Sequence, residues 1–127
     1  MITCTVRGAK DEDTAETLAK SVCSSSLLKA AVFGADANWG RVLCAMGYSG
    51  AVFDPETVDV QFRSEQGQIG VCRAGRALSF SEQTAKEILQ ASAIEILIDV
   101  HDGSGEATAW GCDLTYEYVR INGDYRT

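Results

Sequence analysis

The segment Ile94–Val100 constrains the fold of this chain more than any other, because five of its seven residues are large aliphatic side chains. A short apolar run with turn formers after it is typical of a buried β-strand. The turn-forming residues Asp102–Gly105 follow after His101, and we expect Ala107–Leu114 to return as the antiparallel partner of Ile94–Val100. The sequence therefore predicts a sheet built around this strand.

The first third of the chain adds a strand and a helix to that sheet. Residues Ile2–Arg7 read as a strand that Gly8 closes. Acidic residues at 11–13 suit the positive end of a helix dipole, and apolar residues at helical spacing continue the helix to about Cys23. The apolar segment Leu27–Phe33 is too short for periodicity to separate strand from helix.

Helices and strands alternate irregularly in the remainder, with Asn38 and Ser81 placed to cap two of the helices. The other expected elements are a turn over Gly34–Asn38, a helix over Trp39–Tyr48, the strands Val58–Phe62 and Ile69–Arg73 joined by a loop at Glu65–Gln68, a helix over Glu82–Gln90 and a final helix over Thr115–Asn122. This order favours a single α+β domain over residues 1–127, a mixed sheet with helices packed on it in two layers.

Composition excludes several classes of function. With 18 acidic and 11 basic residues the net charge is −7, which disfavours binding to the phosphates of nucleic acid. No apolar run approaches the roughly 20 residues of a membrane helix, and the N-terminus lacks the pattern of a signal peptide. Five widely spaced cysteines and one histidine suggest neither a disulfide framework nor a metal site. We expect a cytoplasmic protein that needs no cofactor and contacts neither membrane nor nucleic acid.

Two motifs have both a structural and a functional interpretation. The segment Phe33–Arg41 is rich in turn formers around Trp39, so it suits either a helix N-terminus anchored by the indole or an anion site at that N-terminus. His101 is next to Asp102 and would allow base catalysis with Cys112 as nucleophile. The neighbours of Cys112 are acidic or apolar rather than basic, which favours an inert structural thiol.

The last 21 residues, ATAWGCDLTYEYVRINGDYRT, carry more apolar weight than a frayed terminus needs. We therefore expect the end of the chain to be packed, which would hold the terminal carboxylate in a fixed place. Asn122 lies five residues before Thr127. Asn122 and Gly123 would simply end the last helix in one interpretation. In the other, the carboxamide of Asn122 and the carboxylate of Thr127 bind a ligand, since an amide donates and accepts and a carboxylate pairs with an ammonium group.

This ending closely resembles the C-terminus of the ornithine acetyltransferase family, the glutamate N-acetyltransferases of arginine biosynthesis. The segment FGADANWGR resembles a second signature of that family, which usually has Pro where this chain has Ala37, and Gly8-Ala9 after the first strand is a weaker, structural match. Within this resemblance Asn122 and Thr127 occupy the positions that contact the amino-acid substrate, with Gly123 where the family usually has Ala. The resemblance identifies residues 1–127 as the C-terminal domain, roughly the last third, of such an enzyme.

The resemblance also implies what this chain lacks. Family members cleave themselves before a threonine, which then takes acetyl from N-acetylornithine and passes it to glutamate, while an upstream Thr-Gly pair stabilises the oxyanion. These residues and the catalytic glutamate would all precede Met1. The chain alone is therefore predicted to be inactive, with no catalytic residue of its own. Its expected partners are the α chain and the N-terminal part of the β chain, a small amino-acid substrate, and further copies in a multimer.

Two alternatives from other classes remain. The first is a non-catalytic binding or assembly module that has the same fold. The second is a small independent hydrolase or thiol enzyme that uses Cys112 with His101.

Overall fold

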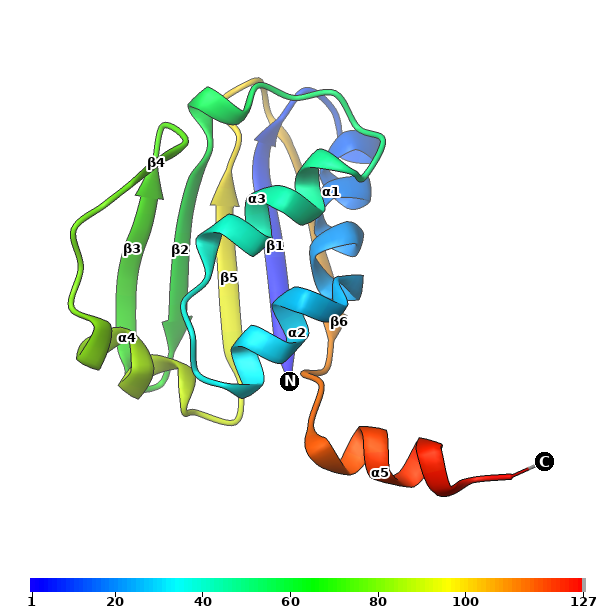
Figure 1. The fold of residues 1–127 in the computed structure, drawn as a ribbon. Coiled ribbons are helices and arrows are strands. Elements are labelled where there is room, and N and C mark those ends of the chain that lie inside the picture. The colour runs from blue at the N-terminus through cyan, green and yellow to red at the C-terminus, as the bar shows by residue number, and fades with distance from the viewer. Residues whose placement is uncertain (127) are drawn as a thin grey trace.

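Six strands form one mixed sheet in the order β4-β3-β2-β5-β1-β6 in the computed structural model, which describes residues 1–126 (Figure 1). The strands are β1 (Ile2–Ala9), β2 (Asp59–Ser64), β3 (Gly67–Arg73), β4 (Arg76–Ala77), β5 (Ile94–Asp99) and β6 (Gly105–Gly111). β1 and β5 are parallel, and the other pairs are antiparallel. The predicted mixed sheet of an α+β domain is confirmed.

The predicted partner of the most apolar strand is wrong. β6 pairs with β1 rather than with β5, and β1 lies between the two. The connection from β5 to β6 crosses the end of β1, where the backbone N–H of Val100 donates to Arg7 and that of Asp102 donates to Gly8. Five residues easily span two strand spacings, about 10 Å. In this arrangement both edges of β1 are hydrogen-bonded, as the backbone of a central strand requires.

The helices begin at local capping residues. They are α1 (Glu12–Ser24), α2 (Ser26–Phe33), α3 (Trp39–Gly47), α4 (Glu82–Leu89) and α5 (Tyr116–Asp124), together with a short 3₁₀ turn over Pro55–Thr57. The predicted caps Asn38 and Ser81 accept from the backbone N–H of Arg41 and Thr84. Ser25 caps α2 through the N–H of Leu28, which resolves the ambiguous segment Leu27–Phe33 as a helix.

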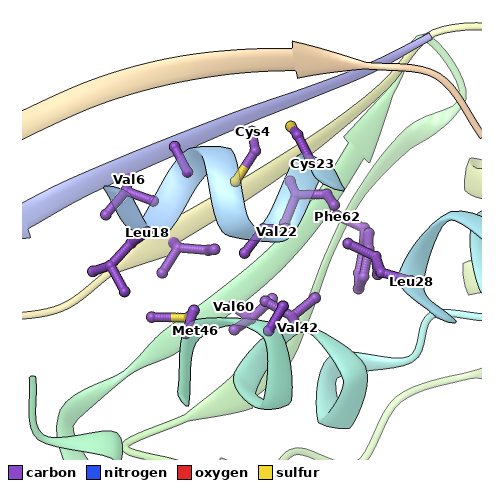
Figure 2. Close-up of a cluster of buried hydrophobic side chains, with 14 of the residues drawn as sticks. Cys4, Val6, Leu18, Val22, Cys23, Leu28, Val42, Met46, Val60 and Phe62 are labelled. Atoms are coloured by element: carbon purple, nitrogen blue, oxygen red, sulfur yellow. The ribbon is translucent and has the colours of Figure 1, made fainter. Parts of the chain in front are cut away.

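One hydrophobic core lies between the sheet and the helices α1–α4. Alternate residues of the strands point into it, as do the buried faces of the helices. Figure 2 shows part of this core, in which Leu18 and Val22 of α1 and Val42 and Met46 of α3 gather around the sheet residues Val60 and Phe62. Fully burying one such side chain stabilises the fold by about 1.5–3 kcal/mol. Helix α5 contributes no buried residue to the core.

Among residues 1–126 no helix covers the other face of the sheet, and this face is mainly polar (Figure 1). Across neighbouring strands Thr5 shares a hydrogen bond with Thr108 at 3.0 Å, and the guanidinium of Arg7 pairs with Asp99. Arg63 pairs with Glu95 in the same way. The alternation of apolar and polar residues along the strands therefore separates a dry face from a solvated one.

Candidate functional site

The candidate substrate residue Asn122 lies on α5, the last helix of the described residues, which projects away from the sheet (Figure 1). Its side chain is exposed, and its amide nitrogen donates to the carbonyl oxygen of Tyr118 one turn earlier at 2.9 Å. This bond uses one of the two N–H groups of the carboxamide. Thr127, the second candidate, lies outside the described residues.

The expected packing of the C-terminal segment is wrong for this chain on its own. Tyr116, Tyr118, Val119, Ile121 and Tyr125 are all exposed. The helix is nevertheless formed, because Thr115 caps it through the N–H of Tyr118. It also continues through Gly123 to Asp124, so Gly123 does not end it.

Helix α5 is attached to the body of the domain at its first turn. The backbone N–H of Leu114 donates to the carbonyl oxygen of Lys29, and the ring of Tyr116 meets the ring of Phe33 edge-on at a centroid distance of 5.1 Å. The sequence does not predict this contact, because Phe33 and Tyr116 lie far apart along the chain and neither segment carries a pattern that pairs them. A concavity of about 410 Å³ lies beside the ring contact between Tyr116 and Phe33. Its lining includes Met1, Phe33 and Asp113.

The segment Phe33–Arg41 forms the connection into α3, as its structural interpretation predicted. Asn38 caps the helix and also donates to the carboxylate of Asp36 at 3.1 Å. Trp39 packs against the core, and Arg41 donates to the carbonyl oxygen of Leu27 at 2.8 Å. The capping interpretation is confirmed, whereas an anion at this helix end stays a prediction.

His101 forms the centre of a small charged cluster at the end of β5. Its Nε2 lies 2.7 Å from Oδ2 of Asp59, and its Nδ1 lies 3.5 Å from Oδ1 of Asp99. The hydrogen bond to Asp59 raises the pKa of His101, and both carboxylates add to the effect. Burial tends to raise the pKa of Asp59, but the hydrogen bonds from His101 and from the backbone N–H of Ala74 lower the pKa overall.

The pairing of His101 with Cys112 as base and nucleophile is wrong. Cys112 follows β6 just beyond Gly111, which pairs with Ile2 at the start of β1. His101 follows β5 beyond Asp99, which pairs with Arg7 near the far end of β1. At about 3.3 Å per residue the two groups are separated by roughly the length of that strand, on the order of 20 Å. This distance excludes a direct proton transfer between them.

A second concavity lies on the uncovered face of the sheet. It measures about 200 Å³ and is lined by polar side chains of β1, β2, β3 and β5, among them Arg7, Asp59 and Gln61. Its charged groups are already paired: Arg7 pairs with Asp99 inside the concavity, whereas Arg63 and Asp59 pair with Glu95 and His101 outside its lining. The polar alternation in these strands was the sequence signal for this surface, but the sequence did not indicate which side chains meet there.

Residues 1–126 contain no group of three or more His, Cys, Asp or Glu side chains placed to hold a metal ion. In the same part of the chain, no helix has the length and apolar character needed to cross a membrane. The cysteines at 4, 23 and 72 are buried and those at 44 and 112 are exposed, all as free thiols.

Comparison with known proteins connects this fold to one family. A family model described as the ArgJ family matches residues 1–127. The chain is 49% identical over 127 residues to the arginine biosynthesis bifunctional protein ArgJ 1 of Clostridium acetobutylicum, and 48% identical over 127 residues to a glutamate N-acetyltransferase of Methanopyrus kandleri. Both matches cover 100% of this chain but only 31% and 32% of the relatives. The chain therefore spans about a third of the length of the curated relatives it matches.

A solved structure has the same fold. The crystal structure of the arginine biosynthesis bifunctional protein ArgJ from Bacillus halodurans superposes with a TM-score of 0.91 and 42% sequence identity, over 98% of this chain and 57% of that chain. The matched region is a larger share of the crystallised chain, 57%, than of the Clostridium relative, 31%. The crystallised chain is therefore about half as long as that relative.

Proposed function

The chain belongs to the ArgJ family, and from this we propose that it forms the C-terminal, substrate-binding part of an acetyltransferase that moves acetyl from N-acetylornithine to glutamate. The observation that carries the proposal is the match of the whole chain to a family whose members are about three times as long. The short crystallised relative agrees with a family whose members are divided into two chains.

Each part has a separate task in the proposed reaction. The nucleophilic threonine hydroxyl, outside this chain, attacks the acetyl carbonyl of N-acetylornithine and releases ornithine. The amine of glutamate then attacks the resulting ester and regenerates the hydroxyl. The carboxamide of Asn122 and the carboxylate of Thr127 bind the amino-acid part of the substrate, the carboxylate pairing with an ammonium group of ornithine. Binding of this kind contributes by positioning the acetyl group for attack.

The test uses this chain in place of the matching 31% of the Clostridium acetobutylicum relative. The 127-residue chain alone is expected to transfer no acetyl from N-acetylornithine to glutamate, and the chimaera is expected to be active. In the chimaera, Asn122→Ala should raise KM for N-acetylornithine about tenfold, the cost of a buried hydrogen bond to a charged substrate, with a smaller change in kcat. The addition of one residue after Thr127 displaces the terminal carboxylate and should likewise raise KM for N-acetylornithine.

Gln66→Ala, which removes an exposed carboxamide from the turn between β2 and β3, is the matched control and should leave KM unchanged. Acetyl transfer by the isolated chain would refute the proposal. An active chimaera in which Asn122→Ala has no effect on KM would instead favour the alternative, a non-catalytic assembly module of the same fold. This alternative is supported by the exposed apolar residues of α5, since exposed apolar patches are typical of surfaces that bind another protein.

A further inference from the structure

Helix α5 is apolar on most of its circumference although no residue of it is buried. The exposed fractions are 81% for Tyr116, 55% for Tyr118, 67% for Val119 and 57% for Ile121. At 100° per residue these four side chains point to different sides of the helix. Glu117 and Arg120, paired with each other at 2.6 Å, occupy the main polar sector. A helix on a protein surface normally has one apolar stripe toward its own core, whereas a helix apolar all round is a buried helix.

The base of α5 is fixed while the rest extends from the domain. The bond from Leu114 to Lys29 and the ring contact between Tyr116 and Phe33 hold its first turn against α2. Beyond that turn the helix leads away from the sheet and from the other helices (Figure 1). The helix is therefore presented in a set direction with its apolar side chains uncovered.

We propose that α5 is a docking arm that inserts into an apolar groove on the part of the enzyme that this chain lacks. This inference rests on the proposed function only in assuming that the missing two thirds of the relatives' length has a counterpart here. Recognition of a helix in a groove uses side chains three and four residues apart as anchors. Tyr116 and Val119 form one such pair and Tyr118 and Ile121 another, so the groove must contact the helix on more than one side.

A second copy of this chain fits the arm less well. Two helices in a symmetric pair cover one stripe of each other and leave the opposite apolar side chains in water. Each copy also carries a net charge of −7, so that two copies repel at low ionic strength. A groove on the absent part of the enzyme is not bound by the two-fold symmetry of such a pair, so it can contact the helix on more than one side.

Docking would also place the candidate substrate residue. Asn122 lies one turn beyond Tyr118 and three residues beyond Val119, so these three side chains share one side of α5. A groove that covers Tyr118 and Val119 therefore borders Asn122. The arm would carry the carboxamide to the wall of a pocket formed with the other part of the enzyme.

The test measures protection of Arg120 from trypsin in the chimaera and in the isolated chain. In the isolated chain α5 is exposed, so trypsin should cut after Arg120 readily. In the chimaera the cut should slow at least about tenfold, because the docked helix must open first. The double substitution Val119→Asp with Ile121→Asp should restore fast cleavage. Val52→Asp, at a residue that is 81% exposed on the loop before the 3₁₀ turn, is the control and should leave the protection intact.

A second measurement applies if the double variant of the chimaera does not fold. This chain is co-expressed with the tagged remainder of the Clostridium relative, and the wild-type chain should be retained with it while the double variant is lost. Equal cleavage of Arg120 in chimaera and isolated chain overturns the proposal, and so does retention of the double variant. A dimer of the isolated chain in analytical ultracentrifugation that the double variant abolishes would show that a second copy covers α5. If Arg120 is protected from trypsin in the chimaera but Asn122→Ala has no effect on KM, the docking of α5 is supported and only the substrate-binding role of Asn122 is refuted.

Discussion

His101 is the residue whose environment most clearly sets a measurable property of the chain. Its ring lies between Asp59 and Asp99, and the hydrogen bond to Asp59 raises the pKa of His101 above its ordinary value of 6.5. A group whose pKa is higher in the folded chain than in the unfolded chain stabilises the fold. This stabilisation is fully present below the unfolded-state pKa and is lost as the pH rises through the folded-state pKa. The lowered pKa of Asp59 acts oppositely, since its stabilisation is present above about 3.8 and is lost as pH falls. The cluster is therefore expected to stabilise the chain most between about pH 3.8 and pH 6.5, the ordinary pKa values of the two groups.

The single histidine makes this prediction simple to test. The ring protons in an NMR titration should report a pKa above 6.5, and the temperature at the midpoint of thermal unfolding should decrease as the pH rises above 6.5 and through that raised pKa. In His101→Asn that fall should be smaller, because asparagine tolerates the left-handed backbone at φ = 56° but has no proton to lose. A pKa at or below 6.5 would contradict the geometry of the cluster.

At this scale the sequence predicts only what is local. Asn38 and Ser81 are correctly assigned as caps because a cap acts on the backbone two or three residues away. The contact of His101 with Asp59 joins residues 42 positions apart and exists only because β2 and β5 pair. Similarly, no physical pattern in the sequence distinguishes Asn122 from any other exposed amide. Its proposed role comes from the resemblance alone.

At the scale of elements the pattern of the sequence predicts type better than pairing. The periodicity of residues 11–23 and the alternation of β1 and β2 identify these elements, because one face of each is buried. The short segment of α2 lacks such a pattern, and its cap at Ser25 decides it. The pairing of β6 is different, because it depends on the order of the strands in the sheet, and β1 lies between β5 and β6. Sequential strands are neighbours only about two-thirds of the time.

The packing of α1 on β6 depends on a glycine at the start of the strand. A Cβ on Gly105 would lie 2.2 Å from the carbonyl oxygen of Asp11 and 2.9 Å from that of Ala9. Both atoms belong to the backbone, so Gly105→Ala must push the start of α1 away from the sheet. We expect it to lower the free energy of unfolding by about 1 to 3 kcal/mol in urea titrations.

Gly47→Ala is the matched control for this substitution. Gly47 is the last residue of α3, and apart from its chain neighbours and the backbone of its own helix no atom lies within 4 Å of its Cβ position. The change should leave the stability unchanged or raise it by up to about 1 kcal/mol, the difference in helix propensity. Equal stability of Gly105→Ala and the wild type would mean that α1 does not approach β6 this closely.

At the scale of the whole molecule, the chain consists of a body with its own core and a helix that adds nothing to that core. The sequence indicated the core, because its buried positions follow helix and strand periods. It did not indicate that the apolar end lies outside it. A high content of apolar residues predicts burial but does not say against which surface. Among the described residues, α5 packs only against Phe33 of α2, and its apolar side chains stay exposed.

Removal of residues 116–127 tests this division directly. The shortened chain should unfold in one cooperative transition and lose only about 1 kcal/mol, the value of one aromatic pair, because the contact of Tyr116 with Phe33 is the main packing lost. Far-UV circular dichroism should lose the helical signal of α5 alone. Leu18→Ala, in contrast, removes a fully buried side chain of α1 and should cost about 2–5 kcal/mol in either length of chain. A large loss of stability on truncation would mean that α5 packs on the body in solution, and the helix would then be part of the core rather than an arm that meets another part of the enzyme.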